Sequence, residues 1–262
     1  MIFSFVKYQG TGNDFVIVDN RDSSFPIEDH HLIAQLCHRN YGIGADGFIA
    51  IESDTTSDFF MRYFNANGHE GSLCGNGSRC AVHYANTLGL TKKEVVFRAA
   101  DGLHQAQFIG KEVALSLHAV SNWEIREDKL FIDTGSPHHI AFVDEVATVD
   151  VANLGAALAH GPPYYADGTN VNFVTVTAND SLHVRTFERG VEAETLSCGT
   201  GVTAAAIGAH ISKRVTAEKI SIQTNGGELT VSFTAISNRY EEVVLQGPAT
   251  PVFKGQWETT TK

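Results

Sequence analysis

The chain carries one cysteine-glycine turn twice, and this duplication constrains its fold more than any other feature of the sequence. The string CGNG at Cys74–Gly77 recurs as CGTG at Cys198–Gly201, 124 positions later, and each copy runs into a helix-like segment. Four further pairs keep nearly the same offset: Gly10–Asp19 with Gly135–Asp144, Gly42–Phe48 with Gly168–Phe173, Arg62–Asn65 with Arg185–Glu188, and Asp101-Gly102 with Asn225-Gly226. A period of this length is the size of a domain rather than of a solenoid repeat. The sequence therefore predicts two lobes of similar structure.

Each half of the chain predicts the same order of elements. Two strands are followed by a helix, two more strands, the cysteine turn with its helix, and three strands joined by tight turns. The helices are expected over residues 30–39 and after Cys74 in the first half, and over 150–159 and 202–211 in the second. The fold class expected from this order is α+β, in which two pseudo-symmetric lobes each wrap a curved, mostly antiparallel sheet around a central helix.

The lobe boundaries follow from the repeat. We expect an N-terminal lobe over residues 1–118 that carries Cys74, and a C-terminal lobe over 119–249 that carries Cys198. Residues 119–126 are expected to form the linker. The tail, 250–262, is expected to return to the N-terminal lobe, because the first strand of each lobe needs a partner.

Composition excludes several classes of protein. The formal net charge is −11, and no basic cluster occurs, which argues against a nucleic-acid partner. No apolar run approaches the roughly 18 residues of a membrane helix, and the first residues do not resemble a signal peptide. We therefore expect a cytoplasmic protein that acts on a small molecule without a membrane partner.

The four cysteines have different expected roles. Cys37 and Cys80 fall within predicted helices and are expected to be packing residues, whereas Cys74 and Cys198 each precede a helix. A thiol at a helix N-terminus lies close to backbone N–H groups and to the positive end of the helix dipole, which lower its pKa. Two such thiols suggest a paired-thiol active site. Neither Cys-x-x-Cys nor His-x-x-x-His spacing occurs, so no metal is expected.

Six strings in the chain together resemble the diaminopimelate epimerase family, the pyridoxal-independent two-cysteine epimerases of the lysine and peptidoglycan pathway. They are GTGNDFVIVD, RYFNANG, CGNGSRC, GSPHH, GTNVNFV and ERGVEAETLSCGTG, and they span about residues 3–212 in family order. The resemblance implies an isomerase that converts LL- to meso-diaminopimelate without a cofactor. It also implies two similar α/β lobes with the active site between them. The family is often dimeric, which leaves a homodimer open.

The resemblance also implies roles for individual residues. Cys74 acts as the base for the LL substrate and Cys198 as the acid, and the order reverses for the meso substrate. His138 and Glu188 hold the thiols in their working protonation states. The distal amino acid group of the substrate is bound by Asn65, Asn170, Glu188 and Arg189, with Asn13 nearer the reacting carbon.

The chemistry of inversion explains why two cysteines are needed. A proton leaves one face of the α-carbon and another arrives at the opposite face, so two opposed acid/base groups serve better than one. We expect the backbone N–H groups of Gly75, Asn76, Gly199 and Thr200, at the two helix N-termini, to hydrogen-bond to the substrate carboxylate. Charge grows on that carboxylate as the carbanion forms, so these donors act most strongly in the transition state.

Two other functions remain open. One is a racemase of the same fold for proline or hydroxyproline, whose cyclic substrate needs an apolar pocket in place of Arg189 and Asn170. The other is a redox protein in which Cys74 and Cys198 form a switchable disulfide. One departure from the family bears on specificity: Ser136 stands where the family often has asparagine, and we expect the shorter side chain either to act through water or to leave a looser distal pocket.

Overall fold

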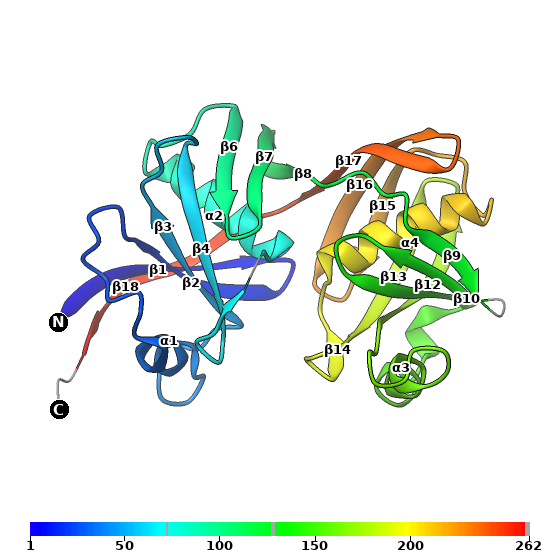
Figure 1. The fold of residues 1–262 in the computed structure, drawn as a ribbon, viewed down its shortest axis with the longest axis horizontal. Helices are drawn as coiled ribbons and strands as arrows, with labels where there is room; N and C mark the ends of the chain where they lie inside the picture. The colour runs from blue at the N-terminus through cyan, green and yellow to red at the C-terminus, as the bar shows by residue number, and fades with distance from the viewer. Residues whose placement is uncertain (72, 127–128, 260–262) are drawn as a thin grey trace. The chain divides into compact units, whose positions relative to one another are not determined.

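The computed structural model describes residues 1–71, 73–126 and 129–259, and the chain divides into two compact units. The first unit consists of Met1–Leu115 together with Gly247–Lys262, and the second of Ser116–Gln246. No helix within the described ranges has the length and apolar character needed to cross a bilayer. Each unit consists of a sheet and two α-helices (Figure 1).

The sheet of the first unit has a strand order that places the end of the chain beside its beginning. The order is β18–β1–β2–β3–β4–β6–β7–β8, with the short β5 paired to β4. The β2–β3 and β4–β6 pairs are parallel and the other pairs antiparallel. Figure 1 shows β18, in red, running along β1, in blue. The strand bounds are β1 Ile2–Gly10, β2 Asn13–Asp19, β3 Gly47–Glu52, β4 Phe59–Asn65, β5 Glu70–Gly71, β6 Glu94–Ala99, β7 Gly102–Ile109, β8 Glu112–Ser116 and β18 Thr250–Glu258.

The second unit repeats this topology strand for strand. Its order is β9–β10–β11–β12–β13–β15–β16–β17, with β14 paired to β13, and the β11–β12 and β13–β15 pairs are parallel. The bounds are β9 Trp123–Arg126, β10 Lys129–Asp133, β11 Pro137–Phe142, β12 Asn170–Ala178, β13 Ser181–Glu188, β14 Ala193–Thr195, β15 Lys219–Thr224, β16 Gly227–Ile236 and β17 Arg239–Gly247. The predicted α+β class with two pseudo-symmetric, mostly antiparallel lobes is therefore confirmed.

Each unit has one outer and one central helix. The outer helices, α1 (His30–Cys37) and α3 (Val151–His160), begin after Asp29 and Asp150, whose carboxylates accept hydrogen bonds from backbone N–H groups of the first turn. The central helices, α2 (Gly75–Thr87) and α4 (Gly199–Ile211), begin directly after Cys74 and Cys198. The glycines of the two repeated turns thus lie in the first turn of each central helix.

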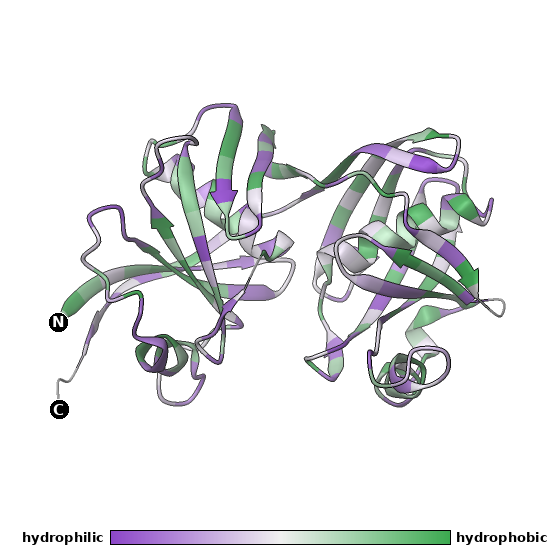
Figure 2. Cartoon of the chain, in the orientation of Figure 1, coloured by the Kyte–Doolittle hydropathy of each residue, from purple (hydrophilic) through white to green (hydrophobic). Residues whose placement is uncertain are grey.

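The central helix of the second unit is apolar on nearly all sides. Its residues Gly201–Ala209 are buried in the main core of that unit, and Figure 2 shows α4 coloured mostly green to white. A helix with no polar face is stable only when other elements cover it completely. The run Ala204–Ala206 keeps this helix thin, so that strands β10–β13, β15 and β16 pack closely around it.

The segment 119–126 differs from its prediction as a linker. Trp123–Arg126 forms β9, which pairs with β10, and Val120 makes an isolated bridge to Tyr240. The strand residues, Trp-Glu-Ile-Arg, alternate apolar and polar side chains, but a run of four is at the lower limit of length at which alternation indicates a strand. The strand forms because β10 offers an edge that needs hydrogen-bond partners. A 3-10 helix, Val146–Thr148, was also not predicted.

Candidate active site

The first-unit cysteine is the N-cap residue of its helix. The Sγ atom of Cys74 accepts a hydrogen bond from the N–H of Gly77 at 3.5 Å, and the thiol donates to Oδ1 of Asn13 at 3.6 Å. The side-chain N–H of Asn76 donates to the same Oδ1 atom at 3.4 Å. The amides of Gly75 and Asn76 precede the first helical backbone bond, which Ser78 donates to the carbonyl of Cys74. The structure thus brings Asn13, Cys74, Gly75 and Asn76 together.

A cluster of charged residues fixes the orientation of Asn13. The side-chain N–H of Asn13 donates to Asp46 at 2.7 Å, which leaves its Oδ1 atom facing Cys74. The neighbouring Asp14 carboxylate lies 2.8 Å from Nζ of Lys7 and 2.9 Å from the guanidinium of Arg39. Burial opposes ionisation of Asp14, but the hydrogen bonds from Arg39 and Lys7 outweigh it and hold the pKa at about 2. The Asp14 carboxylate is therefore ionised at neutral pH, and it pairs with Lys7 and Arg39 beside Asn13.

Asn65 lies apart from these contacts, at the end of β4. Its Oδ1 atom accepts a hydrogen bond from the hydroxyl of Tyr63 at 3.0 Å, and its side-chain N–H donates to the carbonyl of His69 at 3.5 Å. The residue is exposed. Its amide is held in a fixed orientation at the surface of the first unit.

The second-unit cysteine belongs to a chain of buried polar groups. Sγ of Cys198 lies 3.5 Å from Oγ1 of Thr200, which lies 3.0 Å from Nε2 of His138. On the other side of the ring, Nδ1 of His138 accepts a hydrogen bond from the amide of Asn172 at 3.0 Å. The hydroxyl of Thr186 donates to Oδ1 of Asn172 at 2.9 Å, and this bond orients the amide.

The protonation state of His138 follows from these contacts. Its side chain is fully buried, and burial, aided by the positive charge of Arg189, lowers its pKa to about 3. The ring is therefore neutral at neutral pH. Because Nδ1 accepts from Asn172, the ring proton is on Nε2 and is donated to the hydroxyl of Thr200. That hydroxyl is left to donate to Cys198, so the chain of hydrogen bonds ends on the sulfur and can stabilise a thiolate.

The predicted distal residues of the second unit also lie together. The amide N–H group of Asn170 donates to the hydroxyl of Ser136 at 2.9 Å, and its Oδ1 atom accepts from the backbone N–H of Arg189 at 2.9 Å. The guanidinium of Arg189 donates to the carbonyl of Asp167 at 2.6 Å. Glu188 accepts a hydrogen bond from the hydroxyl of Thr195. Ser136 thus directly contacts Asn170.

The remaining cysteines are buried. Cys37 lies in the core around α1, and Cys80 lies in α2 with its side chain fully enclosed. Burial raises the pKa of each thiol to about 12. The prediction that both are buried packing residues is confirmed. Within the described ranges, no group of three or more His, Cys, Asp or Glu residues is placed to hold a metal ion.

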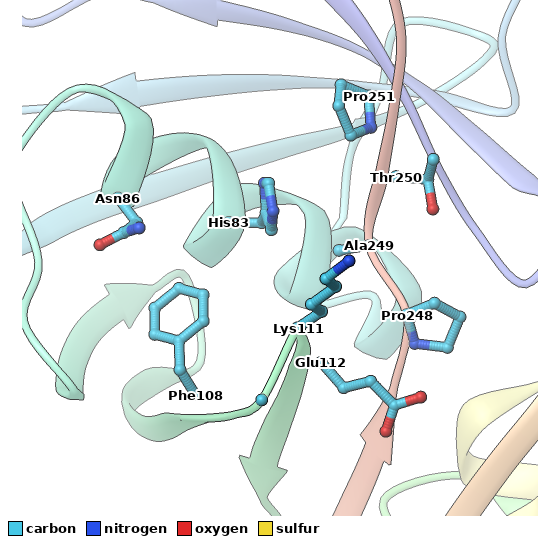
Figure 3. A pocket seen from close by; sticks show the side chains of 10 residues that line it. His83, Asn86, Phe108, Lys111, Glu112, Pro248, Ala249, Thr250 and Pro251 are labelled. Carbon is cyan, nitrogen blue, oxygen red and sulfur yellow. The ribbon is translucent and has the colours of Figure 1, made fainter.

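A cavity of about 560 Å³ lies in the first unit, at the C-terminal half of α2 (Figure 3). Its walls come from α2, from the β7–β8 hairpin and from the segment Pro248–Pro251. His83 lines it, and its Nδ1 atom pairs with the hydroxyl of Tyr8 at 3.0 Å. None of the predicted site residues lines this cavity.

Sequence reasoning missed three residues of the second-unit chain of hydrogen bonds. The hydroxyl of Thr200 was not considered, because only its backbone N–H was expected to act. Asn172 and Thr186 lie on strands β12 and β13 with no motif of their own apart from the strings around them. Asn172 stands between Val171 and Phe173 in a stretch of strand that is buried throughout, and a polar residue placed in this way is the signal that could have identified it.

Comparison with solved structures identifies the class of fold. The chain superposes on a PhzF-family phenazine biosynthesis protein from Bacillus anthracis with a TM-score of 0.78, at 15% identity, covering 99% of this chain and 100% of that one. It superposes on a hydroxyproline epimerase from Agrobacterium vitis, with bound trans-4-hydroxy-L-proline, with a TM-score of 0.67 at 14% identity, covering 97% and 92%. At such identities the likeness extends to the two-lobed fold and no further.

The sequences identify the family. A model of the diaminopimelate epimerase family matches residues 5–114 and 130–252. The diaminopimelate epimerase of Flavobacterium psychrophilum is 43% identical, over 95% of this chain and 97% of its own length. Those of Chlorobaculum tepidum and Aquifex aeolicus are 41% and 37% identical, covering 94% and 96% of this chain and 98% and 96% of their own. The chain belongs to the diaminopimelate epimerase family.

Proposed function

We propose that this protein converts LL-diaminopimelate to meso-diaminopimelate without a cofactor, with Cys74 and Cys198 as the two acid/base groups. The observation that carries the proposal is that each unit holds one cysteine as the N-cap residue of its central helix. Each sulfur also has a neutral polar partner: Oδ1 of Asn13 accepts from the Cys74 thiol, and the hydroxyl of Thr200 can accept from a Cys198 thiol or donate to its thiolate. Family membership supplies the substrate.

The proposed reaction moves one proton off the substrate and another onto it. The Cys74 thiolate takes the α-proton of the LL centre, and the electron pair of the C–H bond remains on the α-carbon and its carboxylate. The Cys198 thiol then gives its proton to the opposite face of the carbon. The thiols have exchanged protonation states, and the reverse reaction begins from that arrangement. Thiols with pKa values near neutrality suit both roles.

The carbanion needs electrostatic stabilisation, because the α-proton of an amino acid is a very weak acid. In the proposal the N–H groups of Gly75, Asn76, Gly199 and Thr200 hydrogen-bond to the reacting carboxylate, where negative charge accumulates. These groups lie in the first turns of α2 and α4, ahead of the helical hydrogen-bond ladder. Loss of one such donor typically costs about 3 kcal/mol of transition-state stabilisation.

The distal end of the substrate is assigned to Asn65, Asn170, Glu188 and Arg189. A carboxylate and an ammonium need donors and acceptors of these kinds, and the contacts among Asn170, Arg189 and Ser136 support a polar pocket in the second unit. His138 acts on Cys198 through Thr200, and Glu188 assists in setting thiol protonation. The hydroxyl of Ser136, which accepts from Asn170, acts on the distal group through a water molecule or leaves a looser pocket for it.

The same proposal covers the setting of the enzyme. It acts in the cytoplasm, in the supply of lysine and of peptidoglycan precursors, and it works as a homodimer. The proposal also divides the protein into two lobes. The N-terminal lobe covers 1–118 with the tail 250–262, and the C-terminal lobe covers 119–249.

Deuterium uptake from heavy water tests the substrate. We expect uptake at the α-carbon of LL-diaminopimelate and none with L-proline or hydroxyproline. Uptake with the cyclic amino acids alone would favour the racemase. Reversible oxidation of both thiols near physiological potential, with no uptake in any substrate, would favour the redox protein.

Substitution of each cysteine tests the mechanism. Cys74→Ser and Cys198→Ser should each abolish net epimerisation while the circular dichroism spectrum and unfolding temperature stay close to those of the wild type. The matched control is Cys37→Ser in α1, which should retain turnover if it folds. Full turnover in either of the first two variants would contradict the mechanism.

A further inference from the structure

Arg79 is a fully buried cation in the central helix of the first unit. Its side chain is 0% exposed, and no carboxylate forms an ion pair with it in the described part of the chain. One of its terminal nitrogens, Nη1, has no hydrogen-bond partner among the described residues. An arginine keeps its charge in proteins, and a buried charge without a counter-ion is costly. An unpaired buried charge of this kind is expected where it has a function.

The hydrogen bonds of Arg79 connect it to the first-unit thiol. Its Nη2 atom donates to Oδ1 of Asn76 at 2.8 Å and to Thr11 at 3.3 Å, and Nε donates to the carbonyl of Pro248 at 3.4 Å. The first bond orients the amide of Asn76 so that its N–H group faces Asn13, the acceptor of the Cys74 thiol. A neutral side chain could make the same bonds at a smaller cost, so the bonds alone do not explain the charge.

The second unit provides an internal comparison, because its central helix begins in the same way. The residue five positions after Cys198 is Thr203, whose hydroxyl is buried and bonds to the carbonyl of Gly199 at 2.9 Å. In the series of hydrogen bonds that leads to Cys198, the nearest titratable group is His138, whose ring is neutral. The helix dipole acts on both thiols, whereas the buried cation acts only in the first unit's helix.

We propose that Arg79 is a positioning residue that makes Cys74, rather than Cys198, the thiolate of the resting protein. The proposal rests on the proposed function, in which these two thiols are the reacting groups. A positive charge within a protein interior lowers the free energy of a nearby anion more than an exposed charge does, because little solvent screens it. Arg79 acts in this way on the sulfur of Cys74, and it also orients the amide of Asn76, which donates a hydrogen bond to Oδ1 of Asn13.

The other titratable groups around this helix do not supply an equivalent charge. Burial raises the pKa values of Tyr8 and Cys80 to about 12 and also raises that of Tyr84, and it lowers the pKa of His83, so these groups are neutral at neutral pH. Lys7 is paired with Asp14, and Arg39 with Asp14 and Asp46. Glu112, on β8, is the acidic group whose charge acts on Arg79. Arg79 is therefore the unpaired cation on this helix.

The rate of alkylation of each thiol by iodoacetamide, measured between pH 5 and 10 by mass spectrometry of the labelled peptides, tests the proposal without substrate. In the wild type we expect a lower thiol pKa for Cys74 than for Cys198. Arg79→Gln keeps hydrogen-bond donors but removes the charge, and should raise the pKa of Cys74 by about one unit, which lowers the reactivity of this thiol about tenfold at pH values well below its pKa. Arg79→Lys keeps the charge and should shift the pKa of Cys74 by much less. The Cys198 profile should not change in either variant.

Arg62→Gln is the matched control, since Arg62 lies in the same unit but pairs with Glu28 and Glu70. It should leave both profiles unchanged. An unchanged Cys74 profile in Arg79→Gln, or equal shifts in Arg79→Gln and Arg79→Lys, would overturn the proposal, because the role of Arg79 would then be structural. If Arg79→Gln does not fold, a wild-type Cys74 pKa at or above that of Cys198 overturns it instead. A protein that shows the predicted shifts but no epimerisation would refute the proposed function and leave this inference standing.

Discussion

The state of His138 shows how position alone sets the chemistry of a residue. The ring is enclosed between an amide and a hydroxyl, so protonation would place a charge in a buried site with no anion in the chain of hydrogen bonds. The histidine therefore cannot be the proton-transfer base at neutral pH. Its role in the proposed reaction is to orient the hydroxyl of Thr200 toward Cys198.

Thr200→Val tests that role. The variant keeps the shape of the side chain but removes the hydroxyl, and we expect kcat to fall about 10- to 100-fold, since a hydrogen bond to a charged group contributes about 1.5–3 kcal/mol. Thr200→Ser should restore most of the activity. Thr177→Val, which removes an exposed hydroxyl on β12, is the control. Wild-type kcat in Thr200→Val would contradict the role of the chain of hydrogen bonds.

The buried neutral state of His138 also predicts how stability depends on pH. Its pKa is about 3 in the folded protein and near 6.5 in the unfolded chain, so the unfolded state binds more protons between these values. The free energy of unfolding should therefore fall as the pH is lowered from 6.5 towards 3, with a contribution from this residue of about 1.4 kcal/mol per pH unit near pH 5.

Urea unfolding at several pH values from 4.5 to 6 measures this slope. In His138→Gln the slope should decrease by about the contribution of one histidine, whatever the stability of the variant at pH 7. His160→Gln, at an exposed position of the same unit, serves as the control. An equal slope in wild type and His138→Gln would show that the ring is protonated in the folded state.

At the scale of elements, the two central helices begin alike, but different side chains pack against the third residue of each, Gly77 in α2 and Gly201 in α4. A Cβ atom added at Gly201 in α4 would collide with Oδ1 of Asn172, whereas one added at Gly77 in α2 would first meet Cδ1 of Ile49 at 3.2 Å. Asn172 is buried and hydrogen-bonded, but the end of an isoleucine side chain can shift. The glycine of the second turn is therefore required for the approach of Asn172.

The paired substitutions Gly201→Ala and Gly77→Ala test this difference. Gly201→Ala should lower the free energy of unfolding by about 1–3 kcal/mol through overpacking and should slow turnover by displacing Asn172 from His138. Gly77→Ala should change stability by less than about 1 kcal/mol, since alanine favours the helix more than glycine does. Thermal or urea unfolding of both variants gives the comparison, and a larger loss in Gly77→Ala would contradict it.

The elements could be predicted from the sequence where local signals agreed. The cysteine-glycine turns mark where α2 and α4 begin, although α4 begins at Gly199, three residues before the expected start at 202. The three-stranded ends of both units follow from alternating residues and tight turns. The strand β9 was not predicted, because its alternating run of four residues is short and pairing with β10 completes it. The series of hydrogen bonds from Thr186 to Cys198 also depends on strands that meet only in the folded protein. No spacing in the sequence predicts these contacts.

At the scale of the whole molecule, each unit has cores of its own. The main core of the second unit surrounds α4, and a core of the first unit lies between α1 and the sheet. The chain enters the second unit at Ser116 and leaves it at Gln246, and β18 then completes the sheet of the first unit beside β1. Separate cores predict that damage to one remains local.

Hydrogen exchange after core truncation tests this independence. Ile222→Ala and Ile33→Ala each remove a fully buried side chain, in the second and first unit respectively, and each should cost about 2–5 kcal/mol. We expect faster amide exchange mainly in the unit that carries the substitution. Equal acceleration in both units would indicate a single cooperative structure.

The central claim is that two thiols, one from each unit, act on opposite faces of one α-carbon. The most direct test follows the first turnovers of LL-diaminopimelate in heavy water and analyses product and remaining substrate separately by mass spectrometry. The account predicts meso product that carries one solvent deuterium at the inverted carbon, while the remaining LL substrate is still unlabelled. Product that retains the original protium of the substrate would mean that a single group removes and returns the same proton, and would contradict the account.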